Sequence, residues 1–548
     1  MVSYIRLTGI VLLCLAAHAV VNAQQGLLQQ TQLQDYYRRL QLAGDTSIKG
    51  SFNLQPYQPR FTQDLFKQKK DTSRFQSIVG FTIQNNSALP YGYNDESLYP
   101  AIGFQQRLTA GIRFETKNLL IKIQPEWVNA ANVSGNDLLP PAVSSLGNYY
   151  ARYFAMVGNR IDMPTYFGDE KLSKVYFGQS ALKYKLSGFE AGVSSENIWW
   201  GPARYNALIM GNNAPGFLYA TLNTTTPVST PIGKLEAQVV FGQLEASGIT
   251  PPEFERMSQL GCPQCYERPT PYKDRKMNGF VVSYSPKGMD HFSVGMAYAS
   301  YKYADTTARS SSLGSLFFRY AMPKDHAEIY AEYGRSDKMM SPFALFQDSV
   351  PYGYTVGFRK MVPTKKQGDF ISISAELSHL GLSKAKLIYD RTNPFGPPNP
   401  NSYSWYTSAS VRHGYTNFGQ VMGASIGPGS NSQTLNIAWV SGQNQLGMQL
   451  QRVMRNTDFY YYNYFNGTTG SGTSSGNTSA FWVDISASLF AQWQLKQLMI
   501  AGSIDYLSSI NYKWLKLDGD FGSPSSLSDK RNFQIRISAL YSIDWMGD

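Results

Sequence analysis

The sequence predicts an all-β transmembrane barrel of about 18 antiparallel strands, preceded by a short helical segment. Composition is the first indication. The chain has 548 residues, of which 16% are charged and 14% aromatic, whereas soluble proteins carry roughly 25% charged residues. The mean hydropathy is −0.30, as expected where apolar and polar residues alternate along strands and cancel in the average. The alternation itself and the lengths of the connections are the second and third indications.

The composition also excludes several classes of protein. A disordered chain would carry few aromatic residues, and a helical membrane protein would contain long apolar runs. The net charge of +11 is spread along the chain, with its densest run at 67–70. Nucleic-acid binding would cluster the cations on one face. A diffuse basic surface suits an acidic polysaccharide or an anionic lipid headgroup better.

Residues 1–23 predict a secretory signal peptide. Arg6 supplies the positive charge, residues 7–21 form the apolar stretch, and small residues at Val21 and Ala23 predict cleavage after Ala23. The mature protein is therefore expected to be exported.

Residues 24–70 differ from the rest and are expected to form a periplasmic segment. Leucines and tyrosines recur near helical spacing over 24–42, which predicts a short amphipathic helix. Pro56 and Pro59 then predict an extended linker.

Residues 71–548 are expected to form the outer-membrane barrel with long external loops. Apolar and polar residues alternate there with the period of a strand that has one face in lipid and one in the lumen. The last strand is the clearest: the residues expected to face lipid are Phe533, Ile535, Ile537 and Ile543, and those expected to face the lumen are Gln534, Arg536 and Ser538. The predicted strands lie near 76–86, 106–116, 119–128, 175–187, 188–195, 216–222, 233–244, 278–286, 291–302, 311–321, 326–335, 352–361, 369–379, 434–441, 446–455, 480–493, 497–507 and 531–544.

The connections between these strands alternate in length. Short polar turns such as 116–118 and 442–445 are followed by long stretches rich in Gly, Ser and Asn, such as 129–174 and 380–433. Tight periplasmic turns and long external loops are typical of a membrane barrel, and a soluble sandwich has no reason to alternate in this way. The stretch 380–433 is also long enough to fold inward and fill the lumen.

Two cysteines remain after removal of the signal peptide, Cys262 and Cys265, in Gly-Cys-Pro-Gln-Cys-Tyr. An oxidising compartment favours a disulfide between them, within a long external loop. A redox role would need a thioredoxin-like neighbourhood, and zinc would need two further ligands. We therefore predict a disulfide and no metal site.

The densest group of residues suited to recognition lies at 195–217. It contains Trp199 and Trp200, then Arg204, and then three asparagines. Aromatic faces stack on the apolar face of a sugar ring, and Arg and Asn bind hydroxyls and carboxylates in fixed directions. The alternative is that the tryptophans belong to the aromatic girdle at the membrane interface and that the remaining residues only turn the chain.

The same motif resembles the signature of the capsule assembly Wzi family. The matching pieces are Trp199-Trp200-Gly201-Pro202, Asn206-Ala207-Leu208-Ile209-Met210 and Asn212-Asn213-Ala214-Pro215, and the segment 413–429 resembles the carboxy-terminal region of that family. Members of the family are outer-membrane barrels that bind capsular polysaccharide at the cell surface.

The resemblance implies a non-enzymatic outer-membrane lectin of a Gram-negative bacterium, with no cofactor, that binds and organises capsular or extracellular polysaccharide. Outer-membrane lipid and the polysaccharide export machinery are the further partners that it implies. The alternative for the same barrel is a porin or sugar-selective channel. The residues predicted to build or brace the polysaccharide site are Trp199, Trp200, Arg204, Asn206, Asn212 and Asn213.

Two enzyme hypotheses are weaker. Ser425 lies in a G-x-S-x-G pattern, with His379 or His413 as a conceivable base, but no helix follows it to form a nucleophile elbow. Glu196 could be one carboxylate of a glycosidase pair, but the sequence places no second carboxylate beside it.

Overall fold

The computed structural model describes residues 30–55, 74–135, 157–250, 273–304, 309–336, 350–382, 404–461, 481–514 and 529–544. Every statement of structure below concerns these ranges. The predicted signal peptide and the cysteine pair Cys262 and Cys265 lie outside the described residues, so both remain predictions.

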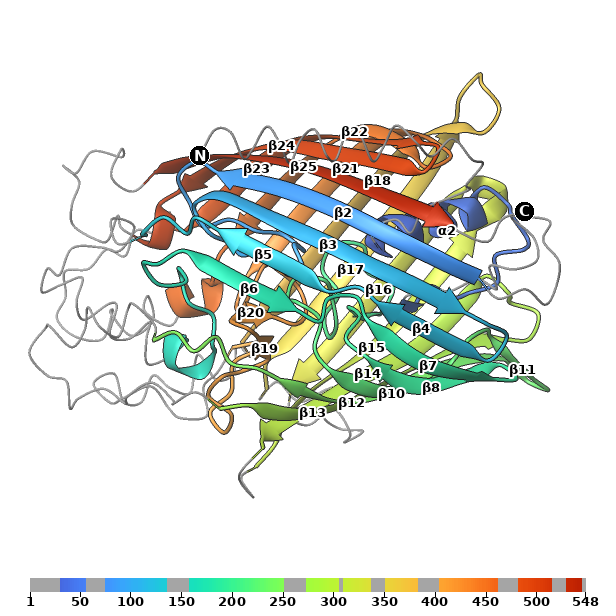
Figure 1. Cartoon of the computed structure of the whole chain (residues 1–548), viewed down its shortest axis with the longest axis horizontal. Coiled ribbons are helices and arrows are strands. Elements are labelled where there is room, and N and C mark those ends of the chain that lie inside the picture. The colour runs from blue at the N-terminus through green and yellow to red at the C-terminus, as the bar shows by residue number, and fades with distance from the viewer. Residues whose placement is uncertain are drawn as a thin grey trace, which may run out of the picture.

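The described chain forms a closed antiparallel barrel (Figure 1). Its wall strands are β2 (Arg74–Asn86), β3 (Gly103–Glu115), β4 (Leu119–Ile123), β5 (Glu126–Ala130), β6 (Leu172–Tyr176), β7 (Ala181–Leu186), β8 (Phe189–Ser194), β10 (Tyr219–Thr224), β11 (Val228–Thr230), β12 (Gly233–Leu244), β13 (Arg275–Pro286), β14 (Phe292–Tyr303), β15 (Ser311–Met322), β16 (Ala327–Ser336), β17 (Tyr352–Pro363), β18 (Asp369–Gly381), β21 (Asn431–Ser441), β22 (Asn444–Met454), β23 (Val483–Leu495), β24 (Leu498–Ile510) and β25 (Lys530–Asp544).

Three pairs of these segments are halves of one wall strand. Both β4 and β5 pair with β3, both β10 and β11 pair with β12, and β6 and β7 pair with β5 and β4 respectively. Counted in this way the described wall has 18 strands, and β2 closes it against β25. The predicted fold class is confirmed, and each of the predicted strands overlaps one wall strand.

The faces of the wall are oriented as the alternation predicts. Phe533, Ile535 and Ile537 are about half exposed on the outer surface, whereas Gln534 is buried inside. The side chain of Ile543 lies outside the described part of the structure. An outward row of apolar side chains recurs on the other strands, as a lipid-facing surface requires.

The two ends of the barrel differ. At one end, named here the short-turn end, tight turns such as 116–118 and 442–443 join consecutive strands. The first and last described residues of the wall, near Gln76 and Asp544, pair at this same end. The opposite, long-loop end carries all the long connections, so the predicted alternation of loop lengths is confirmed.

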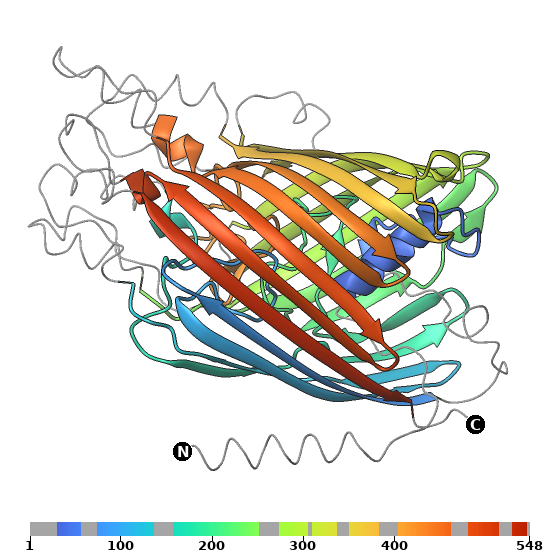
Figure 2. The same ribbon diagram turned by 90° about the horizontal axis from the view of Figure 1, so that it is seen from above.

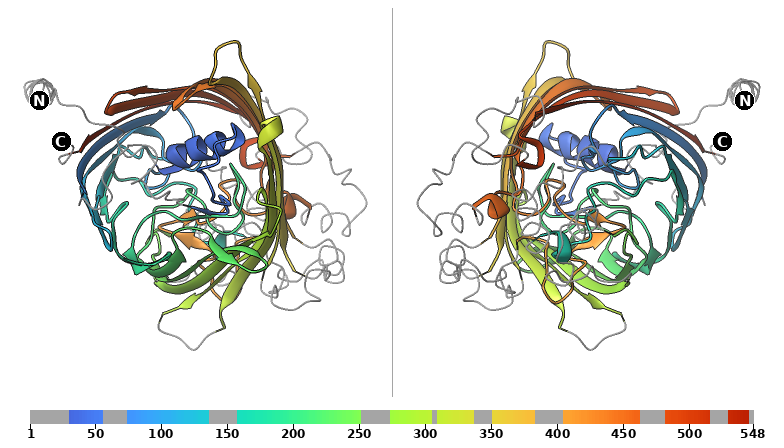
Figure 3. Two further views of the ribbon diagram at one scale, coloured as in Figure 1. Left: turned by 90° about the vertical axis from the view of Figure 1, so that its right-hand side faces the viewer. Right: turned by 90° about the vertical axis from the view of Figure 1, so that its left-hand side faces the viewer.

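Helix α2 (Gln30–Leu42) lies inside the barrel near the short-turn end (Figures 2 and 3). It ends before Gly44, whose φ of 97° gives the left-handed residue that commonly terminates a helix. Tyr37 and Leu42 are buried, and Leu42 packs on Met361 of the wall. The sequence predicted the helix but treated 24–70 as a segment apart from the barrel, whereas the helix is enclosed by the wall. No helix in the described ranges is long and apolar enough to cross a membrane.

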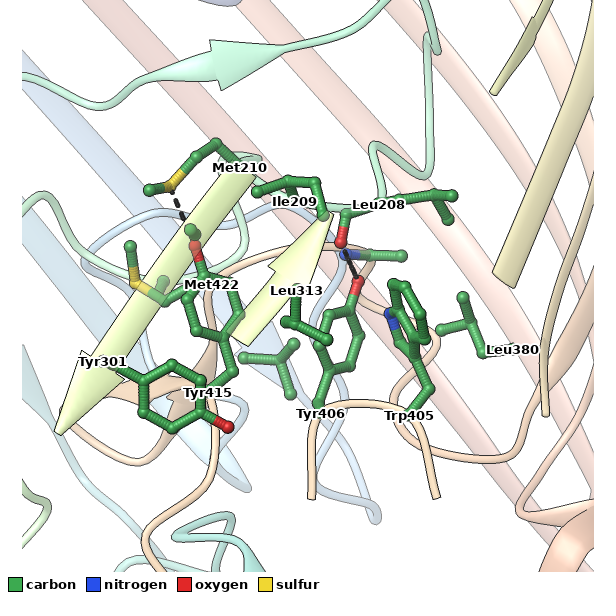
Figure 4. Close-up of a cluster of buried hydrophobic side chains, with 14 of the residues drawn as sticks. Leu208, Ile209, Met210, Tyr301, Leu313, Leu380, Trp405, Tyr406, Tyr415 and Met422 are labelled. Carbon is green, nitrogen blue, oxygen red and sulfur yellow. Dashed lines mark hydrogen bonds between the residues drawn. The ribbon is translucent and has the colours of Figure 1, made fainter. Parts of the chain in front are cut away.

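The core of the molecule fills the lumen. Two connections turn inward from the long-loop end, 195–218 and 404–430, and their side chains form the largest buried apolar cluster. Figure 4 shows Leu208 and Met210 packed against the rings of Trp405, Tyr406 and Tyr415, with the Tyr406 hydroxyl donating to the Leu208 carbonyl at 2.8 Å. The two connections also carry short sheets, β9 (Trp199–Trp200) with β1 (Leu54–Gln55) and β19 (Thr416–Asn417) with β20 (Gln420–Val421). Single turns of 3₁₀ helix form at η2 (Gly158–Arg160), η4 (Pro323–Asp325) and η6 (Tyr512–Trp514), and residues 457–461 form a short helical turn.

Candidate functional site

The segment 195–218, called here the tryptophan loop, leaves β8 and folds into the lumen instead of lying on the surface. Trp199 and Trp200 are 4% and 0% exposed. The Trp200 indole nitrogen donates to Gln238 Oε1 at 2.9 Å, and that of Trp199 donates to the Ala203 carbonyl at 3.0 Å. Neither ring faces lipid, so the girdle hypothesis is wrong for both. Neither is open to a ligand in this structure.

Gly201 of the same motif allows the chain to approach the wall closely. Its φ is +90°, and a Cβ at this position would lie 2.9 Å from the carboxylate of Glu332. A larger residue would therefore be strained in its backbone and would clash with the wall.

Arg204 and Asn206 fix the tryptophan loop to the barrel wall. The backbone amides of residues 204, 205 and 206 all donate to the Glu376 carboxylate, at 2.8 to 3.2 Å. The Arg204 guanidinium donates to Ser374 Oγ and to Asp35 of helix α2. The Asn206 side chain is fully buried and donates to Ser432 Oγ at 3.2 Å. These contacts hold the loop in place by hydrogen bonds, a bracing role.

Asp35 connects the helix to the same network. Burial opposes ionisation of its carboxyl, but the guanidiniums of Arg359, Arg204 and Arg39 outweigh this and hold the pKa of Asp35 well below its usual range. The carboxylate therefore remains charged at any pH at which the protein is expected to work, and it holds helix and loop together.

Asn212 and Asn213 occupy the far end of the tryptophan loop. Asn212 is buried, and its backbone carbonyl accepts from the Glu96 amide at 2.9 Å. Asn213 is less buried, donates to the Val421 carbonyl at 3.1 Å, and lines a cavity. Of the six predicted site residues, Asn213 alone lies in that cavity lining.

Glu196 belongs to a buried ion cluster. Its carboxylate accepts from Lys183 Nζ at 2.9 Å and from Lys122 Nζ at 3.2 Å. Burial raises the pKa of Glu196, but the two ammonium groups outweigh it and lower the pKa to about 2. A glycosidase acid needs a raised pKa, so this residue is unsuited to that role.

The long-loop end holds a cavity of about 190 Å³, named here the rim cavity. Three inward segments line it, 89–92, 163–165 and 419–430. The ends of the neighbouring wall strands complete it with Arg455, Trp482, Asp484 and the turn that contains Tyr512 and Lys513. Residues that lie far apart in the sequence thus form one site.

An ordered ionic pair forms the wall side of the rim cavity. Arg455 Nε donates to Asp484 Oδ2 at 2.8 Å, and Arg455 Nη1 donates to the Ile426 carbonyl at 3.1 Å. The other oxygen of Asp484 accepts from the Trp482 indole nitrogen at 3.0 Å and from Ser509 Oγ at 2.6 Å. The guanidinium and the indole are therefore both held in fixed positions.

The cavity lining also includes polar atoms that have no hydrogen-bond partner among the described residues. Ser425 Oγ and Asn456 Oδ1 are buried and make no hydrogen bond among the described residues. A buried oxygen left without a partner costs roughly 1–3 kcal/mol. Such atoms are expected where a ligand or water supplies the missing hydrogen bond.

Ser425 is not arranged as a nucleophile. The described lining of the rim cavity contains no histidine. His413 Nδ1 instead shares a hydrogen bond of 3.1 Å with the Tyr303 hydroxyl. Burial and the nearby cations lower the pKa of His413 to about 3. His379 contacts the rings of Tyr352 and Tyr354.

The turn that carries Tyr512 and Lys513 is strained. Asn511, Lys513 and Trp514 all have φ between 50° and 55°, a region that residues other than glycine rarely adopt. Strain of this kind persists only where the surroundings enforce it, and it clusters at binding sites. The Lys513 ammonium donates to Thr165 Oγ1 across the cavity edge.

Sequence reasoning missed Arg455, Trp482 and Lys513. Each lies where a wall strand meets a long connection. An aromatic or cationic residue at such a boundary could have indicated a binding site from the sequence. The motif at 195–217 drew attention instead because its residues are contiguous.

Residues 90–259 match the model of the family described as capsule assembly protein Wzi. This stretch, called here the Wzi-family segment, is similar to that family. The Wzi-family segment contains the whole tryptophan loop and part of the rim-cavity lining, and the resemblance seen in the motif is confirmed.

Several solved structures are similar to this chain. Wzi of Escherichia coli, an outer membrane protein involved in group 1 capsule assembly and a carbohydrate-binding β-barrel, matches with a TM-score of 0.52 and 12% identity, over 85% of this chain and 84% of that one. Two Pseudomonas aeruginosa proteins also match: OccK5 (OpdH), with a TM-score of 0.41 and 10% identity over 86% and 98% of the chains, and OprD, with 0.40 and 8% over 89% and 100%. No curated protein matches by sequence. At such identities the likeness to E. coli Wzi shows a shared fold.

Proposed function

We propose that this protein is a non-enzymatic outer-membrane lectin that binds and organises capsular or extracellular polysaccharide, with its long-loop end facing the cell exterior. The rim cavity carries the proposal. It combines aromatic rings, fixed charged groups and unpartnered oxygens at one end of a membrane barrel. Sugars are recognised by this combination, since they present an apolar ring face and many hydroxyls.

The Wzi-family segment and the membrane-type wall support this assignment. The segment supplies the tryptophan loop, which connects the helix, the wall and the cavity through Arg204, Asn206 and Asn213. The loop thus acts as a brace: it holds the cavity lining in place and leaves contact with the sugar to the cavity itself.

The alternative function is a porin or sugar-selective channel. The packing of the lumen argues against it, because Trp200, Trp405 and Tyr406 are completely buried in an apolar core where a channel would hold water. Helix α2 also lies inside the lumen (Figure 3). In planar bilayers the purified protein should therefore show no large steady conductance. Such a conductance would favour the channel.

Binding of polysaccharide isolated from the source bacterium to the full-length protein in detergent micelles tests the proposal. Trp482→Ala removes an aromatic ring from the cavity and should weaken binding at least about tenfold, or about 1.4 kcal/mol. The matched control is Trp493→Ala, which removes an outward-facing tryptophan of the same strand region, 38% exposed. Equal binding by wild type and both variants would assign the sugar to another surface.

A further inference from the structure

We propose that the outer face of the β13–β14 hairpin carries a binding site for a lipid phosphate, formed by Lys276 and Lys302. The ligand is a membrane lipid whose headgroup carries phosphate, in the leaflet on the long-loop side of the barrel. The site lies on the outside of the wall, away from the rim cavity, and its function goes beyond polysaccharide binding.

Lys276 of β13 and Lys302 of β14, called here the lysine pair, lie directly opposite each other in the sheet register. Both residues are exposed and lie between buried neighbours, so both side chains point outward from the wall. Cβ atoms in this arrangement are about 4.5–5.5 Å apart, and like charges directly opposite destabilise a sheet. Such a pair is therefore expected where an anion offsets the repulsion.

The described part of the chain supplies no carboxylate to the lysine pair. Neither lysine side chain forms an ion pair or a hydrogen bond with a described residue. Asp274 belongs to the same outward row of β13, but its Oδ2 accepts from Gln243 Nε2 at 2.7 Å. Within the described structure, both ammonium groups therefore retain their donors for a ligand.

The outward residues of this hairpin change from apolar to cationic toward the long-loop end. In that direction the opposed outward pairs are Val282 with Met296, Phe280 with Tyr298, Asn278 with Ser300, and finally the lysine pair. The rings of Phe280 and Tyr298 are in contact, with their centroids 5.7 Å apart. Apolar residues followed by aromatic residues and then by cations are the order found where a membrane protein passes from hydrocarbon to headgroups. The lysine pair is therefore placed among lipid headgroups.

The height of the lysine pair above the aromatic rings agrees with this placement. An antiparallel strand advances about 3.4 Å per residue, and wall strands tilt by roughly 40° from the barrel axis. The lysine pair therefore lies about 10 Å along the axis beyond Phe280 and Tyr298. Aromatic residues mark the edge of the hydrocarbon core, and the headgroup layer beyond it is roughly 5–8 Å thick. Long lysine side chains reach back over this distance toward the lipid.

Phosphate is the headgroup anion that suits this pair best. A phosphate ester has several strong acceptor oxygens and carries up to two negative charges, so one group can accept from both ammonium groups. Lysine binds phosphate as a compact point charge that donates in several directions. The side chains of Asn278 and Ser300 lie on the same outward face and add neutral donors one step closer to the hydrocarbon.

The experiment compares lipid A, a phosphorylated lipid with several acyl chains, with the same lipid after removal of its phosphates. Binding of each lipid to the full-length protein in neutral detergent micelles is measured by native mass spectrometry. Each basic residue at an anionic lipid surface contributes about a fivefold gain in affinity. Phosphorylated lipid A should therefore bind at least about tenfold more tightly than the dephosphorylated form. Inorganic phosphate in excess should not displace it, because free phosphate gains nothing from the apolar and aromatic residues below the lysine pair.

Variants test the two assigned lysines. The double variant Lys276→Gln with Lys302→Gln should remove most of the preference for the phosphorylated lipid, and each single variant should remove part of it. The matched control is Lys287→Gln with Lys324→Gln, which removes the same charge from exposed lysines at the short-turn end. Heat-resistant migration of the folded barrel on gels should be retained by the double variant, since the substitutions relieve a like-charge repulsion. If the double variant does not fold, the two single variants carry the test.

Loss of the preference in the lysine-pair variants, with the preference kept in the control, supports the site. The proposal is overturned if wild type binds both forms of the lipid equally, or if the lysine-pair variants keep the full preference. An equal loss in the control would show a non-specific effect of net charge and would also overturn it. Displacement of the lipid by inorganic phosphate would assign the pair to free phosphate instead of a lipid.

Discussion

Glu328 is the residue on which the attachment of helix α2 depends most. Its Oε2 accepts from Arg38 Nε of the helix at 2.9 Å and from Arg319 Nε of the wall at 2.8 Å. Arg359 Nε lies 3.8 Å from the other oxygen. The carboxylate side chain is 0% exposed and that of Arg38 is 4% exposed. One buried anion therefore attracts three guanidiniums that come from the helix and two wall strands.

Replacing Glu328 by Gln keeps the shape of the side chain and removes the charge. Loss of one partner from a buried ion pair costs roughly 3–5 kcal/mol, because the remaining charge is left uncompensated. The amide oxygen of the substituted side chain would still accept one hydrogen bond, which favours the lower end of this range. We expect the Glu328→Gln variant to lose about 3 kcal/mol of stability and to release helix α2 more readily than wild type does.

The assay is the temperature at which the folded barrel loses its fast migration on gels, together with protease sensitivity of helix α2. The control is Asp290→Asn, which removes an ion pair with Lys234 whose side chains are 65% and 35% exposed. Exposed pairs contribute roughly 0–1 kcal/mol. If Glu328→Gln melts at the temperature of Asp290→Asn with its helix equally protected, the buried network does not hold the helix.

The wall and the core give three further predictions. Ile537→Arg places a charge on the lipid face and should cost roughly 2–4 kcal/mol near the midplane, whereas Ser538→Arg should be tolerated; equal loss of folded barrel in both would argue against the orientation. Trp200→Ala should cost roughly 3–5 kcal/mol by leaving a cavity in the lumen core, which the same gel assay measures; a stable variant would mean that the ring is not part of the brace. Burial raises the pKa of Asp458 from its ordinary 3.8 to about 6, although hydrogen bonds from Leu382 and Ser404 oppose this. The folded protein then binds the proton more tightly than the unfolded chain, so stability falls as pH rises from about 4 to about 6; Asp458→Asn should reduce the difference in melting temperature between about pH 5 and about pH 7, and an unchanged difference would contradict this explanation.

The wall was predictable because its signal is local. In a strand with one apolar and one polar face, apolar and polar residues alternate along the sequence, as in Phe533, Gln534 and Ile535. The short turns then show which strands are neighbours in the barrel. Registers such as Ile83 opposite Ile537 follow once the barrel closes.

The contents of the lumen were not predictable in the same way. Glu376 and Glu328 appear in the sequence as ordinary lumen-facing polar residues. Their partners are Asn206 and Arg38, which lie 170 and 290 residues away. Nothing local distinguishes a loop that folds inward from one that stays outside, so the placement of helix α2 and the tryptophan loop depended on these distant ion pairs and hydrogen bonds.

The candidate site was likewise predictable only where its residues are close together in the sequence. The motif around Trp200 was visible as a cluster and is part of the structure that supports the cavity, but its aromatic rings are buried. The residues that line the cavity, such as Arg455 and Lys513, come from separate strand ends and become one site only in three dimensions.

Deletion of the gene from the source bacterium tests the central claim most directly, with polysaccharide measured separately in the cell-bound and shed fractions. Loss of a surface lectin should shift polysaccharide from cells to medium while the total stays constant, and wild-type protein should restore retention where Trp482→Ala does not. An unchanged partition between the two fractions would contradict the account.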